Sequence, residues 1–218
     1  MADGRFVIFS GVWPGRGGAG GSALPETGPD DTIVCADMGY EVCAGAGIRP
    51  AAVIGDFDSL SGERIAAIDA AGIERVVYPV EKDDTDTMLC AKYGLARGFE
   101  RFMIVGGIGE GFGHTMANLQ TLSFLMDMGC EAEILTEKER LFMTGGEAVF
   151  SGRPGAKFFV LSYSERSTGV YIENARYGLT DAVLTHSYPI GAGNEFINAA
   201  PVRVSVGQGR LLIIPDRF

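Results

Sequence analysis

Aspartates follow three of the apolar segments in the first half of the chain. The set comprises Asp37, Asp56, Asp58, Asp83 and Asp86. If the segments are parallel strands, their carboxyl ends share one edge of a sheet and the side chains converge there. Clustered carboxylates repel unless they share a cation, and Mg²⁺ prefers carboxylate and phosphate oxygens. The pattern predicts a Mg²⁺ site for a phosphorylated ligand, held by Asp56, Asp58 and Asp86. The alternative is that the aspartates only cap helices or complete turns.

A glycine-rich segment, 106–113, follows another apolar run and precedes a helical pattern. Glycines let the backbone approach phosphate closely, and the next helix offers free N–H groups. The G-x-G-x-x-G fingerprint fails because its third position is Phe112, and a Walker A loop fails because no lysine is present. His114 and Asn118 lie one turn apart on the helix, so they could face one ligand or simply pack. The segment is compatible with phosphate binding or with a tight turn.

The composition argues against several classes of function. A net charge of −10 and a pI near 4.7 are unlike a nucleic-acid-binding surface, which is usually basic. None of the four cysteines forms a C-x-x-C pair and there are two histidines, so no zinc site is expected. Neither a signal peptide nor a membrane-spanning helix is expected from the apolar runs. Most cysteines lie in or beside apolar segments, which indicates buried thiols of a reducing, cytoplasmic compartment.

Short apolar runs alternate with helical patterns in the first 135 residues. This alternation predicts an α/β domain with a mostly parallel, Rossmann-like sheet and helices. A surface loop rich in Gly and Pro is expected over 11–28. The predicted strands are 6–10, 32–36, 51–54, 75–78, 102–105 and 132–135, and the predicted helices are 62–71, 85–97 and 114–128, with a shorter one ending at Ala46.

The pattern changes in the last third of the chain, where short apolar runs alternate with Gly, Pro and Asn turns. This pattern predicts a small antiparallel β-sandwich domain. We therefore divide the chain into domains 1–140 and 141–218. The apolar runs 158–161 and 211–214 also predict an apolar face that a twofold dimer interface would cover.

Three motifs of the first domain, taken in order, resemble those of the thiamin pyrophosphokinase family. The pair G-D-x-D-S and K-D-x-T-D is rather specific, and the resemblance covers most of the chain from about residue 32 onward. Two segments of the second domain resemble the family's closing region. The motifs are Gly55-Asp56-Phe57-Asp58-Ser59, Lys82-Asp83-x-Thr85-Asp86, Gly106-Gly107-x-Gly109 running into His114-x-x-x-Asn118-Leu119, Tyr177-Gly178-Leu179 and Gly191-x-Gly193-Asn194-Glu195-Phe196.

The resemblance implies a nucleotide-binding α/β domain, a β-sandwich domain and a homodimer that binds thiamin between subunits. It also implies a Mg²⁺-dependent reaction that moves a diphosphoryl group from ATP to the thiamin hydroxyl and releases AMP. By resemblance, the catalytic residues would be Asp56, Asp58, Asp83 and Asp86, the nucleotide-binding residues Lys82, Thr85, Gly107, Gly109, His114 and Asn118, and the substrate-binding residues Asp37, Gly193 and Asn194.

The sequence departs from the family's pattern at several positions. Gly111 and Gly113 stand where the family usually has Arg and Asp before the histidine, and Gly193 stands where a serine is often found. The second domain has no Trp to stack on the pyrimidine, which leaves Tyr188 or Phe196 for that role. Two alternatives therefore stay open, a diphosphokinase acting on another small alcohol and a non-catalytic protein that binds thiamin or a nucleotide.

Overall fold

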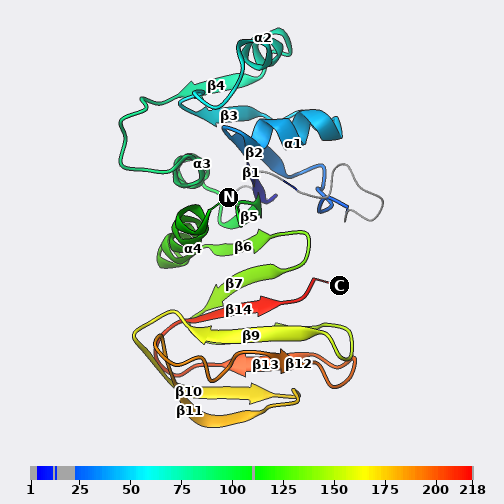
Figure 1. Cartoon of the computed structure of the whole chain (residues 1–218), viewed down its shortest axis with the longest axis vertical. Helices are drawn as coiled ribbons and strands as arrows, with labels where there is room; N and C mark the ends of the chain where they lie inside the picture. Colours follow the sequence, from blue (N-terminus) through cyan, green and yellow to red (C-terminus); the bar gives the residue numbers. More distant parts are fainter. Residues whose placement is uncertain (1–3, 12, 14–22, 110, 218) are drawn as a thin grey trace. The chain divides into compact units, whose positions relative to one another are not determined.

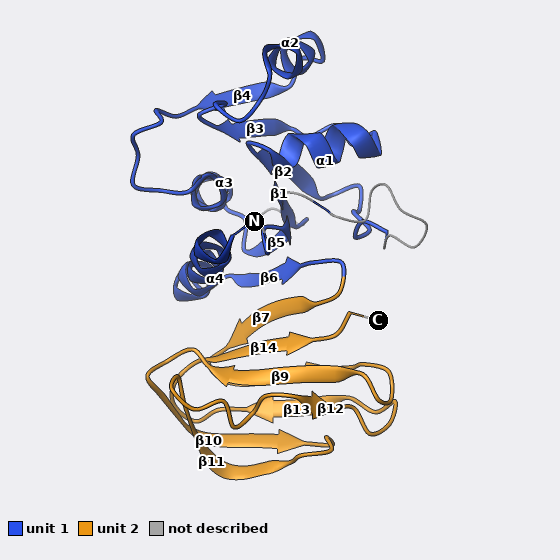
Figure 2. Ribbon diagram, in the orientation of Figure 1, with its two compact units in different colours: residues 1–137 blue, residues 138–218 orange. Residues whose placement is uncertain are grey.

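The computed structural model describes residues 4–11, 13, 23–109 and 111–217 of the chain (Figure 1). The loop predicted over 11–28 lies largely outside the described residues. The chain divides into two compact units, residues 1–137 and residues 138–218 (Figure 2). Each unit has an apolar core of its own.

In its described residues, the first unit contains six strands and four helices. Its strand order is β6-β5-β1-β2-β3-β4, and every pairing between these neighbours is parallel. The chain leaves β1 in one direction for β2 and later returns on its other side as β5, so the order reverses beside β1. Open α/β sheets bind ligands at such a point, outside the carboxyl ends of the strands. The elements are β1 (Phe6–Ser10), β2 (Thr32–Ala36), α1 (Gly39–Ala46), β3 (Ala52–Gly55), α2 (Gly62–Ala70), β4 (Glu74–Val77), α3 (Asp86–Leu95), β5 (Arg101–Gly106), α4 (Phe112–Asp127) and β6 (Glu131–Leu135).

Helices cover both faces of the parallel strands, because successive side chains of a strand point to opposite faces. Val7 and Phe9 of β1 belong to a core that includes Cys43 of α1 and Ile68 of α2. On the other face α3 lies against β1, β2 and β3, and its Gly94 approaches the rings of Phe6 and Phe102. The helix α4 packs beside α3 (Figure 1). The predicted strands and helices of this unit are confirmed to within two residues at each end.

The second unit consists of strands whose pairings are antiparallel. One set runs in the order β12-β9-β14-β7, and a separate four-stranded sheet runs in the order β11-β10-β13-β8. Between the two sets lies an apolar core in which the rings of Phe150, Phe158 and Phe196 meet at centroid distances of 4.9–5.8 Å. The strands are β7 (Arg140–Thr144), β8 (Glu147–Phe150), β9 (Lys157–Ser162), β10 (Arg166–Glu173), β11 (Leu179–Thr185), β12 (Asn194–Glu195), β13 (Val202–Ser205) and β14 (Leu211–Pro215).

The chain is thus an α/β protein that combines parallel and antiparallel pairings and has a second, antiparallel sheet. In the part that the structure describes, no helix is long and apolar enough to cross a membrane.

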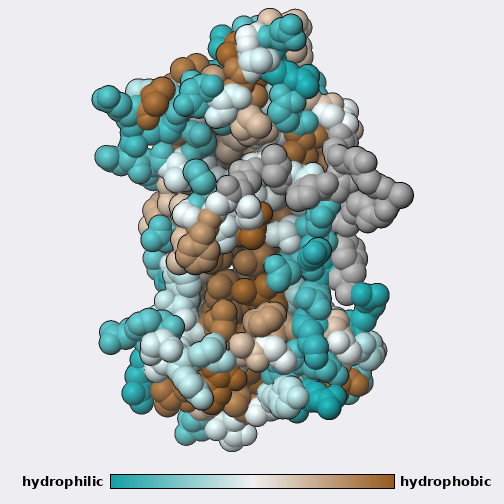
Figure 3. Space-filling model, viewed as in Figure 1, coloured by the Kyte–Doolittle hydropathy of each residue, from teal (hydrophilic) through white to brown (hydrophobic). Residues whose placement is uncertain are grey.

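A second apolar face lies on the strands β7, β14 and β9. Phe158, Val160, Leu211 and Ile213 face the core of the unit, so the residues between them point the other way. The cross-strand pairs Leu161–Leu212 and Phe159–Ile214 therefore stand on the opposite face. Figure 3 shows apolar side chains gathered where these three strands lie in Figure 1. Phe159, Leu161 and Ile214 remain partly exposed to solvent.

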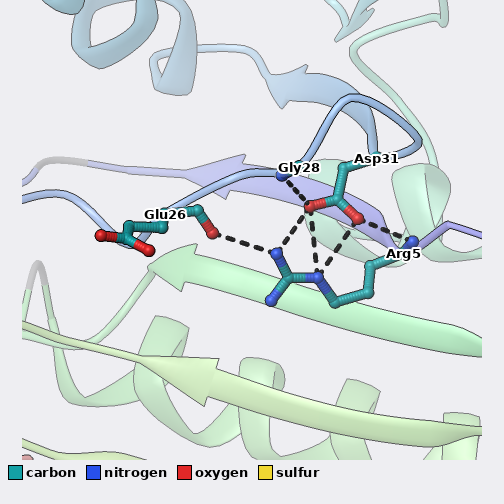
Figure 4. A network of polar contacts seen from close by, with 4 residues as sticks. All are labelled: Arg5, Glu26, Gly28 and Asp31. Carbon is teal, nitrogen blue, oxygen red and sulfur yellow. Dashed lines mark hydrogen bonds and ion pairs between the residues drawn. The ribbon is translucent and has the colours of Figure 1, made fainter.

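An ion pair fastens the start of β1 to the segment that precedes β2 (Figure 4). The Arg5 guanidinium lies 2.6 Å from Asp31 and donates a hydrogen bond to the Glu26 carbonyl. Asp31 also accepts hydrogen bonds from the backbone N–H groups of Arg5 and Gly28. Burial alone would raise the pKa of Asp31, but these hydrogen bonds outweigh it and lower the pKa to about 2. The pair therefore ties the residue before β1 to the segment that precedes β2.

Candidate active site

A cavity of about 410 Å³ lies in the first unit at the carboxyl ends of the parallel strands. Ser10 ends β1 and Asp37 follows β2, while Asp56 follows β3. The first residues of α3 and the first two turns of α4 complete the walls. The lining combines carboxylates with hydroxyl and amide groups. The described lining residues are Ser10, Gly11, Ala36, Asp37, Met38, Asp56, Ser59, Val80, Lys82, Asp84, Thr85, Asp86, Thr87, His114, Ala117 and Asn118.

Asp37, Asp56 and Asp58 form the three-carboxylate set, in which one oxygen from each residue lies within 4.8 Å of the others. Asp37 is 5% exposed, and its buried Oδ1 atom has no hydrogen-bond partner among the described residues. Burial raises the pKa of Asp37, and the neighbouring carboxylates raise it further. An unpartnered buried carboxylate oxygen is costly unless something binds it. Oxygen-only donors at this spacing suit a hard cation such as Mg²⁺.

Two residues with left-handed backbone conformations shape this set. Asp37 has φ 36° and Phe57 has φ 63°. The Phe57 ring is buried in the core of the first unit. Because Phe57 points into the core, its neighbours Asp56 and Asp58 are both free to turn toward Asp37. Such conformations cost free energy and persist where the surrounding structure enforces them, often at functional sites.

Lys82 bridges two of the predicted acids. Its Nζ atom lies 2.6 Å from Asp56 Oδ2 and 2.9 Å from Asp86 Oδ1. Burial opposes the charged lysine, but the hydrogen bond to Asp56 and the ion pair with Asp86 outweigh that effect and raise the pKa of Lys82. The hydrogen bond from Lys82 likewise lowers the pKa of Asp56, whereas burial raises the pKa of Asp86. Asp86 thus stands beside the three-carboxylate set, next to the Gly55 backbone, rather than within the set.

The other predicted residues of the acidic stretch have different surroundings. Asp83 is exposed and does not line the cavity. Thr85 lines the cavity and is also the N-cap of α3, because its hydroxyl accepts a hydrogen bond of 3.2 Å from the Met88 N–H. This cap fixes the first turn of the helix and with it the position of Asp86.

Two buried hydrogen bonds fix other polar groups that line the cavity. Ser10 Oγ lies 2.6 Å from Thr87 Oγ1, and the Asn118 amide donates to the Gly107 carbonyl at 2.6 Å. Gly107 has φ 73°, and a Cβ atom there would lie 2.6 Å from Asn118 Nδ2, so only glycine allows this approach. Sequence reasoning missed Ser10 and Thr87. Their one signal was position, since Ser10 ends an apolar run and Thr87 follows Asp86.

The start of α4 also faces the cavity. His114 lines it, and no side chain caps the helix at Gly111. The Gly109 N–H donates to Thr115 Oγ1 at 3.2 Å, which ties the predicted glycine segment to the helix. Free N–H groups in the first turn of a helix suit a phosphate oxygen.

In the second unit, some of the residues predicted to contact substrate already make contacts within the unit. Asn194 is buried, and its amide donates to the Tyr177 carbonyl at 2.8 Å and accepts from the Tyr177 N–H at 3.0 Å. Gly193 has φ 73°, a conformation that favours glycine over the serine often found there. Phe196 is 1% exposed and belongs to the core, so it cannot stack on a ligand. Tyr188 is 68% exposed and remains the aromatic candidate.

The first unit matches a known family model. The family model "Thiamin pyrophosphokinase, catalytic domain" matches residues 28–134, which include every carboxylate of the cavity. The chain is 24% identical over 180 residues to thiamine pyrophosphokinase of Bacillus subtilis, covering 82% of this chain and 84% of that protein. This chain belongs to the thiamin pyrophosphokinase family.

Solved structures show that the fold is shared along the whole chain. The crystal structure of thiamine pyrophosphokinase from Bacillus subtilis has a TM-score of 0.84 at 21% identity and covers 97% of this chain and 99% of its own. The yeast enzyme has a TM-score of 0.79 at 12% identity, covering 100% of this chain and 87% of its own. The matches do not favour the two alternatives, a different alcohol acceptor and a non-catalytic binding protein.

Proposed function

We propose that this protein is an ATP-dependent thiamin diphosphokinase, which transfers a diphosphoryl group from ATP to the thiamin hydroxyl and releases AMP. The observation that carries the proposal is the three-carboxylate set, Asp37, Asp56 and Asp58, with the unpartnered Oδ1 atom of Asp37. Phosphoryl transfer needs mainly positioning and charge neutralisation, which a cation site beside a cavity of this size can supply. The first unit then serves as a Rossmann-like nucleotide-binding domain.

The donor set supports Mg²⁺ as the metal. Asp37, Asp56 and Asp58 would hold it, and the sequence-based choice of Asp86 gives way to Asp37 in this assignment. When bound, the ion neutralises charge on the phosphate oxygens. The protein's own groups position the substrates. The Thr87 hydroxyl and the Asn118 amide line the cavity, where the phosphate chain would lie, and the start of α4 offers N–H groups.

Asp86 is our candidate for the group that accepts the proton of the thiamin hydroxyl. It lines the cavity beside the metal set, and burial raises its pKa, which makes it a better base than an exposed aspartate. In the step, the hydroxyl oxygen bonds to the β-phosphorus of ATP, the bond from that phosphorus to the α,β-bridging oxygen breaks, and AMP leaves. The proton passes to the Asp86 carboxylate, so the atoms and charges balance.

We further propose that the second unit binds thiamin and forms a homodimer. The support is the apolar face of β7, β14 and β9, where Phe159, Leu161 and Ile214 remain partly exposed (Figure 3). A twofold interface would bury such a face. Gly193, Asn194 and Tyr188 are the residues of this unit that we assign to the thiamin side. The four cysteines of the chain, which all lie in the first unit, are free thiols, which supports a cytoplasmic location.

The test is AMP release from ATP and Mg²⁺ with thiamin, compared with an analogue of thiamin that lacks the hydroxyl group. We expect AMP to form only with thiamin, because the hydroxyl is the nucleophile. Thiamin binding without AMP release would identify a binding protein instead. AMP release with other small alcohols but not with thiamin would identify a different diphosphokinase.

A further inference from the structure

Lys82 already occupies the acidic end of the cavity as a counter-ion. Its Nζ atom contacts Asp56 and Asp86 at 2.6 and 2.9 Å, and the lysine and Asp56 side chains are only 13% and 11% exposed. Among the described residues that line the cavity, Lys82 is the one lysine or arginine. The ammonium group of Lys82 therefore neutralises part of the carboxylate charge at this end of the cavity.

The position of Lys82 conflicts with full use of Asp56 as a metal ligand. Asp56 Oδ2 accepts the hydrogen bond from Lys82, and Asp56 Oδ1 accepts one from the Asp58 N–H at 3.2 Å. Both carboxylate oxygens are therefore engaged by donors. The backbone N–H is fixed by the turn, whereas the lysine side chain has a flexible four-carbon stem. A divalent cation that takes Asp56 must compete with the ammonium group for it.

We propose that Lys82 is a displaceable counter-ion that couples metal binding to nucleotide binding. A divalent cation on Asp37, Asp56 and Asp58 displaces the ammonium group from Asp56. The displaced group then needs a new anionic partner, and the cavity beside it holds room for the phosphates of a nucleotide. Without nucleotide the ion therefore binds weakly, because it takes Asp56 from the Lys82 ammonium group and leaves that group without a new anionic partner. The ion and the nucleotide together bind tightly, because the displaced ammonium group then forms an ion pair with the phosphates.

This coupling has a reciprocal form that can be measured. If the nucleotide raises the affinity for the ion by a given factor, the ion raises the affinity for the nucleotide by the same factor. Removing the ammonium group removes the competition and the new phosphate contact at once. The metal affinity of the free protein should then rise while the coupling factor falls. The competition between Lys82 and the ion does not depend on thiamin, and only the identity of the phosphate ligand rests on the proposed function.

The experiment measures Mn²⁺ affinity by titration calorimetry for the parent protein, Lys82→Met and the control Lys92→Met. Lys92 contacts Asp84 at 2.6 Å, outside the three-carboxylate set, so the control removes the same charge nearby. Each protein is titrated with and without α,β-methylene ATP, in which the bond to be broken is replaced. Without nucleotide, we expect Lys82→Met to bind Mn²⁺ about tenfold more tightly than the parent, a change of about 1.4 kcal/mol. The control should change by about twofold or less, as expected for an exposed pair.

The coupling factor decides the second half of the proposal. The analogue should tighten Mn²⁺ binding by about tenfold or more in the parent and much less in Lys82→Met, within the usual range of such couplings. Lys82→Arg, which keeps the charge, should behave like the parent, and melting curves in EDTA show whether each variant is folded. Mn²⁺ affinity in Lys82→Met that equals or falls below that of Lys92→Met overturns the proposal. An undiminished coupling factor in Lys82→Met overturns it as well.

The two proposals can fail separately. If Lys82→Met binds Mn²⁺ more tightly and loses the coupling but the parent forms no AMP with thiamin, the counter-ion role stands and the thiamin reaction falls. If the parent forms AMP with thiamin but Lys82→Met and Lys92→Met bind Mn²⁺ with the same affinity, the thiamin reaction stands and the counter-ion role falls.

Discussion

Replacing Asp37 by Asn separates stability from function at the three-carboxylate set. Asp37 is 5% exposed, and its Oδ1 atom has no partner. Asn has nearly the same shape, tolerates the φ of 36° and removes the buried charge. The new amide can also donate to the neighbouring carboxylates. An unsatisfied buried polar group costs about 1–3 kcal/mol, so we expect the variant without ligands to gain about 1 kcal/mol of stability. For a chain of this size that raises the melting temperature by about 2–4 °C.

The catalytic effect should have the opposite sign. Loss of one preorganised electrostatic group typically costs about 3–4 kcal/mol of barrier, so turnover should fall by about two to three orders of magnitude. The assay pairs AMP formation from ATP and thiamin with thermal unfolding in EDTA and in Mg²⁺. The parent should melt at a higher temperature with Mg²⁺, and Asp37→Asn should gain much less. Parental turnover in the variant, or a lower melting temperature in EDTA, would refute the assignment of Asp37 to the cation site.

Three further predictions test the framework around the site. Arg5→Met should lower the free energy of unfolding by about 1–2 kcal/mol at pH 7. Because the folded pKa of Asp31 is depressed to about 2, this contribution is present above the unfolded pKa of Asp31 and is lost as pH falls through the folded pKa. The unfolding free energies of parent and variant should therefore approach each other as pH falls toward 2; an undiminished difference at pH 2 would contradict the role of the ion pair. Gly107→Ala should cost about 1–3 kcal/mol more stability than Gly109→Ala, since both have positive φ but only Gly107 contacts Asn118; equal losses would show that backbone strain alone matters. Leu161→Glu should give a monomer by light scattering at micromolar concentration, whereas the control Tyr171→Glu, on an exposed position of the other sheet, should remain dimeric; a Leu161→Glu dimer would place the interface elsewhere.

Local sequence was enough to predict most elements of the first unit. The strands are short apolar runs, and Gly or Asp residues lie at the ends of β1, β2, β3 and β5, so periodicity and turn residues locate them. Asp56 and Asp58 could be placed together because a single residue, Phe57, separates them in one tight turn. The helix α4 begins at Phe112, two residues before the predicted start, because the glycines there gave no capping signal.

The arrangement within the site depends on contacts that local sequence does not encode. Asp37 meets Asp56 because β2 and β3 pair with Ala36 opposite Ile54 and because Asp37 adopts a left-handed conformation. No local pattern shows that register, so Asp86 was chosen in place of Asp37. The Lys82 bridge joins residues 26 positions apart. Phe196 was a candidate for stacking on thiamin, but the core around Phe150 and Phe158 takes its ring.

The most direct test of the central claim is to measure AMP and thiamin diphosphate in one reaction of the parent protein with ATP, Mg²⁺ and thiamin. A diphosphoryl transfer to thiamin predicts that the two products appear in equal amounts and that neither forms without thiamin or in EDTA. Formation of ADP with thiamin monophosphate, or of AMP without thiamin diphosphate, would contradict the claim.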